Sequence, residues 1–397
     1  MQFKQLTLVD NVGVGIEIVG DLAALVVRDL SFGHHIRDKV LILDWKRGIV
    51  RAELYTNSRR YQSAIFLTPD IVLVTNAHER CLEIWRIPAI NETATMPFIC
   101  GTPELSLAMP AIHPGFVVSE FACRGAPNPA LTIPNTSRPF HSSATTAILV
   151  FHLTISPIDP RVPIPFIFFA HRKTFLDLLA TAAAGKELSN SNESLNPLSP
   201  TSNTIPVLAP PIPWSAWGRP VTRWLHARNI PTEWITSTSG QRFAFVSTHA
   251  PALPQPIVVL DFNEHHVKKV TADQKNDLPP YHGAFTPSKV LRESQTQTGH
   301  TGNVTNTTNT TASIAIESID DSQRKLWRRV WLETVPDAYA KMAVFREEVG
   351  GHLPYVAVKS EKLYDFHGVL MDDERIIGIK RNRVLSGVES IEVIHMG

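Results

Sequence analysis

The stretch AIFLTPDIVLVTNAHERCLEIWRI, residues 64–87, decides the fold, because it contains three short apolar runs separated by two turns. The first turn is Thr68-Pro69-Asp70, and residues 76–80 form the second, polar connection. Short apolar runs bounded by such turn residues predict β-strands joined as hairpins. We therefore expect an antiparallel meander whose strands are residues 64–67, 71–74 and 82–87.

A similar phrase recurs along the chain: an apolar strand ends in a polar or aromatic residue and is followed by a turn. It occurs at residues 40–45, 82–85, 147–152, 257–263 and 391–395. Trp45 and Trp85 are 40 residues apart, near the period of about 40–45 residues of WD-type blades, but the later copies are spaced irregularly. Small sheets in series must cover each other's faces, which a radial arrangement achieves. The prediction is an all-β fold, an irregular and incomplete β-propeller of about five WD-like antiparallel blades.

The composition fits one soluble, folded domain over residues 1–397. The chain has 30 prolines, 43% hydrophobic residues and a formal net charge of +1. A near-neutral chain has no global field that would attract nucleic acid or an anionic membrane, and no apolar run approaches the roughly 20 residues of a membrane helix. Cys81, Cys100 and Cys123 form no zinc or disulfide pattern, and the N-terminal segment lacks the features of a secretory signal. We therefore expect reduced thiols in a cytoplasmic or nuclear protein.

Several insertions interrupt the predicted propeller. Residues 186–211, rich in Ser, Asn and Pro, and residues 293–315, rich in Thr and Asn, are low-complexity tracts that we expect to be mobile. Residues 171–184 have the apolar spacing of an amphipathic helix, and residues 323–333 predict a short helix with two tryptophans on one face. The final sheet is expected to use residues 341–345, 355–358, 368–371, 376–379 and 390–394.

Eight phrases, taken in order, resemble the propeller-like C-terminal region of F-box proteins of mushroom-forming (basidiomycete) fungi. They are LILDWKRG (41–48), FLTPDIVLV (66–74), LEIWRIP (82–88), PWSAWGRPVTRWL (213–225), GQRFAFV (240–246), VVLDFNEHHVKKV (258–270), LPYVAVKS (353–360) and GVLMDDERIIGIK (368–380). The resemblance covers most of the chain.

The resemblance implies a non-catalytic function, the recognition of proteins by a ubiquitin-ligase substrate adaptor. F-box proteins of this group carry an N-terminal helical F-box that binds a Skp-type adaptor, whereas this chain begins in strand-like sequence. We therefore expect an unidentified protein partner, and we do not expect the chain to bind the ligase adaptor. The alternatives are a propeller scaffold that acts independently of ubiquitin ligases and, less favoured, a propeller-fold enzyme.

The candidates for chemistry have simpler structural explanations. His78-Glu79 begins like a metalloprotease motif, but Leu82 stands where the second histidine is needed, so a polar hairpin loop is expected. His265-His266 follows a strand that ends near Asp261, where polar turn residues are usual. Asp372-Asp373-Glu374-Arg375 fits a hairpin turn whose aspartates bond the local backbone. The sequence thus predicts no catalytic, cofactor-binding or metal-binding residues.

One cluster of aromatic and cationic residues is a candidate for partner binding: Trp214, Trp217, Arg219, Arg223 and Trp224. Tryptophan and arginine are enriched at binding hot spots, and placement in a loop would suit recognition. The alternative, which we favour, is a buried wedge between blades with the arginines stacked on the aromatic rings.

Overall fold

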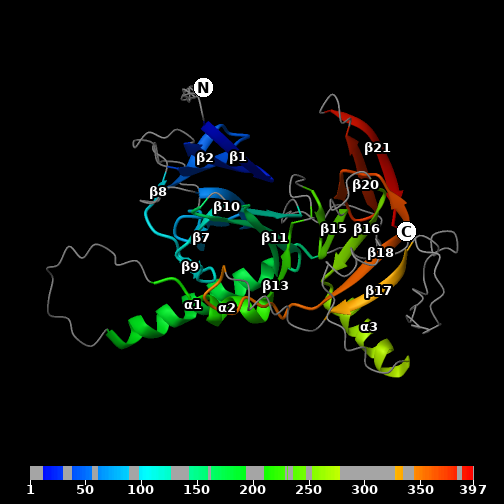
Figure 1. Ribbon diagram of the computed structural model, residues 1–397. Coiled ribbons are helices and arrows are strands. Elements are labelled where there is room, and N and C mark those ends of the chain that lie inside the picture. Colours follow the sequence, from blue (N-terminus) through cyan, green and yellow to red (C-terminus); the bar gives the residue numbers. More distant parts are fainter. Residues whose placement is uncertain are drawn as a thin grey trace, which may run out of the picture.

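The fold is seen in a computed structural model of the chain (Figure 1). The structure describes residues 12–29, 38–55, 61–88, 98–126, 143–159, 162–193, 210–228, 230, 236–246, 253–277, 327–333, 344–381 and 387–396. The tract predicted at residues 293–315 and most of the one at residues 186–211 lie outside these residues.

The strands form five sheets, which we number in chain order. The first sheet has the order β1 (Val12–Val19), β2 (Leu22–Asp29), β3 (Lys39–Asp44), β4 (Ile49–Tyr55) and β8 (Phe98–Cys100). The second has β5 (Tyr61–Thr68), β6 (Ile71–Asn76), β7 (Cys81–Arg86) and β9 (Leu105–Ala108). The third has β10 (Phe116–Gly125), β11 (Ile148–Pro157), β12 (Ile164–His171) and β13 (Thr222–His226).

The two remaining sheets come from the C-terminal half. The fourth sheet has the order β14 (Thr238–Ser239), β15 (Arg242–Val246), β16 (Gln255–Asp261), β18 (Tyr355–Tyr364) and β17 (Trp327–Glu333). The fifth has β19 (Gly368–Met371), β20 (Arg375–Arg381) and β21 (Val388–His395). All the strand pairs are antiparallel except β4 with β8.

The sheets pack in series because their faces are apolar on both sides. Successive residues of a strand point to opposite faces, so Ala64 and Phe66 of β5 enter a core shared with the first sheet. Ile65 and Leu67 enter a core shared with the third sheet. Further along, the third and fourth sheets share a core, and so do the fourth and fifth. Each inner sheet is therefore covered on both faces by its neighbours.

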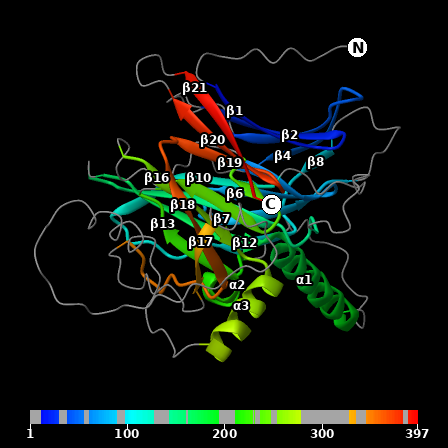
Figure 2. The same cartoon turned by 90° about the vertical axis from the view of Figure 1, so that its right-hand side faces the viewer.

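Three helices lie at one end of the molecule, away from β1 and β21 (Figures 1 and 2). They are α1 (Arg172–Glu193), α2 (Trp214–Val221) and α3 (Glu264–Asp277). The helices α1 and α2 add side chains to the core of the second and third sheets, and α3 packs Val267 and Val270 against Val356 of β18. No helix among the described residues is long and apolar enough to cross a membrane.

The all-β prediction is confirmed, and the meander over residues 64–87 is found as β5, β6 and β7. The helix predicted at residues 171–184 is α1. The helix predicted at residues 323–333 is wrong: residues 327–333 form β17, which pairs with β18. A spacing of four between the two tryptophans fits a strand as well as a helix, because four is a multiple of the strand period.

Three further expectations are corrected. Residues 355–358 belong to the fourth sheet, because β18 pairs with both β16 and β17 rather than with the strands of the fifth sheet. Phe345, expected in the final sheet, instead forms an isolated bridge with Ile112. His265 and His266, expected in a polar turn after β16, lie in the helix α3, which the sequence pattern did not predict.

Candidate functional site

The three tryptophans of the predicted partner-binding cluster are core residues. Trp214, Trp217 and Trp224 are at most 1% exposed. The ring of Trp214 lies edge-on to both others, at centroid distances of 5.0 and 5.5 Å, and Trp224 stacks on Phe168 at 4.7 Å. The indole nitrogen of Trp217 donates a hydrogen bond to the carbonyl of Ala108. Their burial matches the alternative of a buried wedge.

The two arginines of the cluster differ. Arg223 is buried, donates from Nε to the carbonyl of Leu353 at 2.8 Å, and lies over the ring of Tyr355 at 5.3 Å from its centroid. The stacking partner is therefore a tyrosine and not an indole. Arg219 is partly exposed and forms an ion pair of 2.8 Å with Glu348. Of the five residues, Arg219 is the one whose side chain reaches solvent.

The hairpin turn predicted at residues 372–375 has the expected structural role, whereas His265 and His266, expected in a turn, lie in α3. Asp372 accepts hydrogen bonds from the backbone N–H groups of Glu374 and Arg375, which closes the β19–β20 hairpin. Asn263 accepts hydrogen bonds from the N–H groups of His265 and His266, which caps the start of α3. No group of His, Cys, Asp and Glu in the described part of the chain has the arrangement of a metal site.

A cleft of about 440 Å³ opens at the end of the second sheet where β6 turns into β7. One wall is the turn with Ala77, His78 and Arg80, and the other is the segment that leads into β10 of the third sheet. Residues 344–346 cross behind this segment, where Phe345 forms a β-bridge with Ile112. The cleft thus joins three segments that are far apart in the chain.

The cleft combines a basic rim with an apolar floor. The rim carries His78, Arg80, His113 and Arg346, all exposed, and the floor includes Ile112 and other apolar residues. The other apolar lining residues are Ala77, Pro114, Phe116, Val117 and Val118, of which Pro114 and Val117 are exposed. Among the residues that the structure describes, neither Arg80 nor Arg346 has a carboxylate within ion-pair distance. Two unpaired guanidinium groups beside apolar side chains suit an anionic group that is attached to an apolar one.

A buried carboxylate holds the wall that carries Arg80. Glu83 of β7 accepts hydrogen bonds from the Tyr61 hydroxyl at 2.7 Å, the Asn76 amide at 2.8 Å and the Trp85 indole at 3.2 Å. The side-chain oxygen of Asn76 in turn accepts the backbone N–H of Glu79 at 3.0 Å, within the turn. The turn is therefore fixed from the protein interior.

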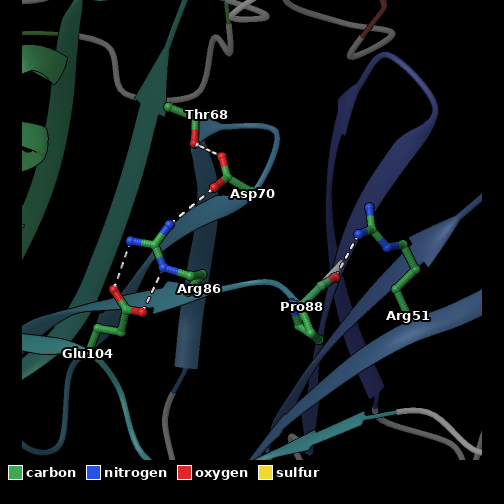
Figure 3. A network of polar contacts seen from close by, with 6 residues as sticks. All are labelled: Arg51, Thr68, Asp70, Arg86, Pro88 and Glu104. Atoms are coloured by element: carbon green, nitrogen blue, oxygen red, sulfur yellow. Dashed lines mark hydrogen bonds and ion pairs between the residues drawn. The ribbon is translucent and has the colours of Figure 1, made fainter. Parts of the chain in front are cut away.

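The opposite end of the second sheet carries a different polar network (Figure 3). Arg86 donates two hydrogen bonds to Glu104 and one to Asp70, whose other carboxylate oxygen accepts the Thr68 hydroxyl. These bonds to Glu104 raise the pKa of Arg86 above its usual value. Because this guanidinium is already bonded within the protein, the network ties β-strands together and offers little to a ligand.

Several titratable groups with shifted pKa values lie outside the cleft, and Glu17 among them is partly buried. Burial raises the pKa of Glu17 in β1 to about 7, against the attraction of Arg172. Burial lowers the pKa of His152 in β11 to about 3, and neither ring nitrogen has a hydrogen-bond partner. The pKa values of the Cys81 and Cys123 thiols are raised by burial, so both stay protonated at neutral pH.

The sequence pattern missed the cleft. It singled out His78 but not Arg80, His113 or Arg346, whose proximity depends on the bridge between Ile112 and Phe345. The described chain is an all-β protein with a basic cleft at one end of its second sheet. Comparisons with family models, curated proteins and solved structures found no match.

Proposed function

We propose that the protein is a non-catalytic recognition module that binds an acidic segment of another protein in the basic cleft. The observation that carries this proposal is the pair of unpaired guanidinium groups, Arg80 and Arg346, above a floor of apolar side chains. Arginine forms strong, often bidentate hydrogen bonds with carboxylates, and apolar anchors supply much of the affinity of protein interfaces. A segment with aspartate or glutamate next to an aliphatic or aromatic residue fits both.

The architecture supports the same proposal. Five sheets packed in series are consistent with the blades of an incomplete β-propeller, a scaffold that presents the turns between its strands as binding surfaces. The cleft is built from such a turn and from the segments beside it. The resemblance to F-box proteins adds that the bound protein is a ubiquitin-ligase substrate, recognised in the cytoplasm or nucleus.

A peptide selection tests the recognition site without knowledge of the partner. A display library of random 12-residue peptides is panned against the wild-type protein and the double variant Arg80→Gln/Arg346→Gln. The control Arg228→Gln/Lys269→Gln removes two exposed positive charges outside the cleft. We expect the wild type and the control to enrich acidic peptides with an apolar neighbour, and the cleft variant to lose them. Equal enrichment by the cleft variant would reject the proposal.

A second experiment separates ligase adaptors from ligase-independent scaffolds. The purified chain is mixed with a purified Skp-type adaptor and cullin, and complex formation is measured by size-exclusion chromatography. A stable complex would support direct action in a ligase. Selection of acidic peptides without such a complex would leave the recognition site standing and favour a scaffold.

A further inference from the structure

The fifth sheet ends on an exposed edge strand, as does the first sheet, whose edge strand β1 exposes Val14, Ile16 and Ile18 at 52, 62 and 51%. Its order is β19-β20-β21, so among the strands that the structure describes β21 has a neighbour on one side and a free edge on the other. Seven of the eight residues of β21 are exposed, including Val388, Ile391 and Val393 at 57, 62 and 49%. By contrast, the edge strands β9 and β13 are buried along most of their length. Figure 1 shows β21 on the outside of the molecule.

The hydrogen-bond pattern shows which backbone groups face outward. The N–H of Met396 donates to the carbonyl of Glu374, which precedes β20. Alternate residues of a strand share their hydrogen-bonding direction, so the N–H of Ile394 also points to β20, where it is opposite Ile376. The backbone groups of Ile391 and Val393 therefore point away from β20 and form the free edge.

One face of the sheet beside this edge is apolar, and it is exposed at Ile391 and Val393 of β21, although Ile379 of β20 is only 5% exposed. Ile391 and Val393 lie opposite Ile379 and Ile377 of β20, and Ile377 lies opposite Leu370 of β19. The core with the fourth sheet uses the other face, through Val369, Met371, Ile376 and Ile394. A strand added to this edge would extend the face that carries Ile391 and Val393. Its side chains on that face would have to be apolar.

The charged residues of β21 indicate which kind of strand could bind along its free edge. β21 carries two exposed glutamates, Glu389 and Glu392, and Glu392 forms an ion pair of 3.2 Å with Lys362. Two copies of β21 side by side would bring these acidic side chains together, and like charges on adjacent strands are destabilising. An incoming strand with lysine or arginine would pair with them instead.

We propose that the free edge of β21 binds an extended segment of a partner protein in which apolar residues alternate with lysine or arginine. The backbone groups of Ile391 and Val393 supply the main-chain hydrogen bonds, as in other cases of β-strand addition. The apolar residues of the segment continue the face of Ile391 and Val393, and its basic residues lie on the opposite face, beside Glu392. This surface is separate from the cleft, so the inference does not depend on the recognition site there.

The test uses two ten-residue probes, one alternating valine with lysine and one alternating valine with glutamate, at concentrations where each alone is monomeric. Binding to the full chain is followed by fluorescence anisotropy. Val393→Pro removes one outward N–H and leaves the ladder to β20 intact, because edge strands tolerate proline at such positions. Val393→Thr keeps the N–H and the β-branched shape and serves as the control. Circular dichroism verifies that both variants are folded.

We expect the wild type and Val393→Thr to bind the lysine probe, with at least tenfold weaker binding to the glutamate probe and to Val393→Pro. The variant Arg80→Gln/Arg346→Gln should bind the lysine probe as the wild type does, which distinguishes this edge from the cleft. Equal affinity for both probes, or unchanged binding by Val393→Pro, would overturn the proposal. It would also be overturned by a concentration-dependent dimer that Val393→Pro abolishes, without probe binding, which would identify a second copy as the occupant.

Discussion

The side-chain amide of Asn76 donates a hydrogen bond of 2.8 Å to the buried carboxylate of Glu83, and through this contact the interior of the second sheet holds the turn at the cleft. The side-chain oxygen of Asn76 accepts a hydrogen bond from the backbone N–H of Glu79 inside that turn. The position of Arg80 beside the cleft is therefore coupled to a buried carboxylate, which makes both stability and binding sensitive to Glu83.

Replacing Glu83 with alanine should lower the free energy of unfolding by about 3 kcal/mol, because several buried donors lose their acceptor. Glu83→Gln keeps one acceptor oxygen and should cost about half as much. Urea denaturation measures both. Glu120→Ala, at an exposed carboxylate, is the control and should change stability by no more than about 0.5 kcal/mol. A Glu83→Ala protein as stable as this control would show that the buried network contributes little.

Glu17 should make the protein less stable at neutral pH than at pH 4. Its pKa is about 7 in the folded state and 4.5 ordinarily, so the folded state binds the proton more tightly. The stability contribution is complete below about pH 4.5 and is lost as the pH rises toward 7, by about 3 kcal/mol. Glu17→Gln should abolish this loss, which thermal unfolding between pH 4 and pH 8 measures. The same pH dependence in wild type and variant would contradict the burial of this carboxyl group.

His152 should make the protein less stable at acidic pH, which is the opposite of the effect of Glu17. Its pKa is about 3 in the folded state and 6.5 ordinarily, so the unfolded state takes up the proton first as the pH falls. Stability from this group is lost below about pH 6.5, by about 2 kcal/mol at pH 5. His152→Leu should be at least as stable as wild type at pH 5, because it removes two unsatisfied ring nitrogens. Chemical denaturation at pH 5 and pH 7 provides the comparison, and a variant that is less stable at pH 5 would refute it.

Gly351 should tolerate no side chain. A Cβ atom there would lie 2.0 Å from the carbonyl oxygen of Thr222 and 2.6 Å from Cα of Arg223, both backbone atoms. Gly351→Ala should therefore reduce the free energy of unfolding by about 1–3 kcal/mol through a forced backbone shift. Gly115→Ala, with no atom within 4 Å of the new Cβ, is the matched control. If the urea denaturation curves of the two variants coincide, the backbone at Gly351 packs less closely against Thr222 and Arg223 than described.

The strands were predictable where apolar runs met strong turn residues, as in β5, β6 and β7. The turn at Asp372 was also within reach, because short polar side chains bond to their own backbone in a known way. Residues 327–333 were mistaken for a helix because the spacing of their tryptophans is shared by both structures. Pairing with β18, a contact distant in the chain, decided between them.

The candidate site was less predictable. Tryptophan and arginine occur both in cores and in interfaces, and Trp214 and Arg223 could be assigned to the core only once their burial was known. The cleft, for its part, joins Arg80 to Arg346 through a bridge between two segments more than 200 residues apart in the chain. Isolated arginines in a turn and a loop give no signal of such a meeting.

The most direct test of the recognition site is calorimetric titration with the acidic peptide that the wild type selects most strongly. Loss of two charge-assisted hydrogen bonds should weaken binding to Arg80→Gln/Arg346→Gln at least about 150-fold, at about 1.5–3 kcal/mol for each bond. The control Arg228→Gln/Lys269→Gln should bind within twofold of the wild type. Binding by the cleft variant that equals the wild type would show that the cleft is not the recognition site.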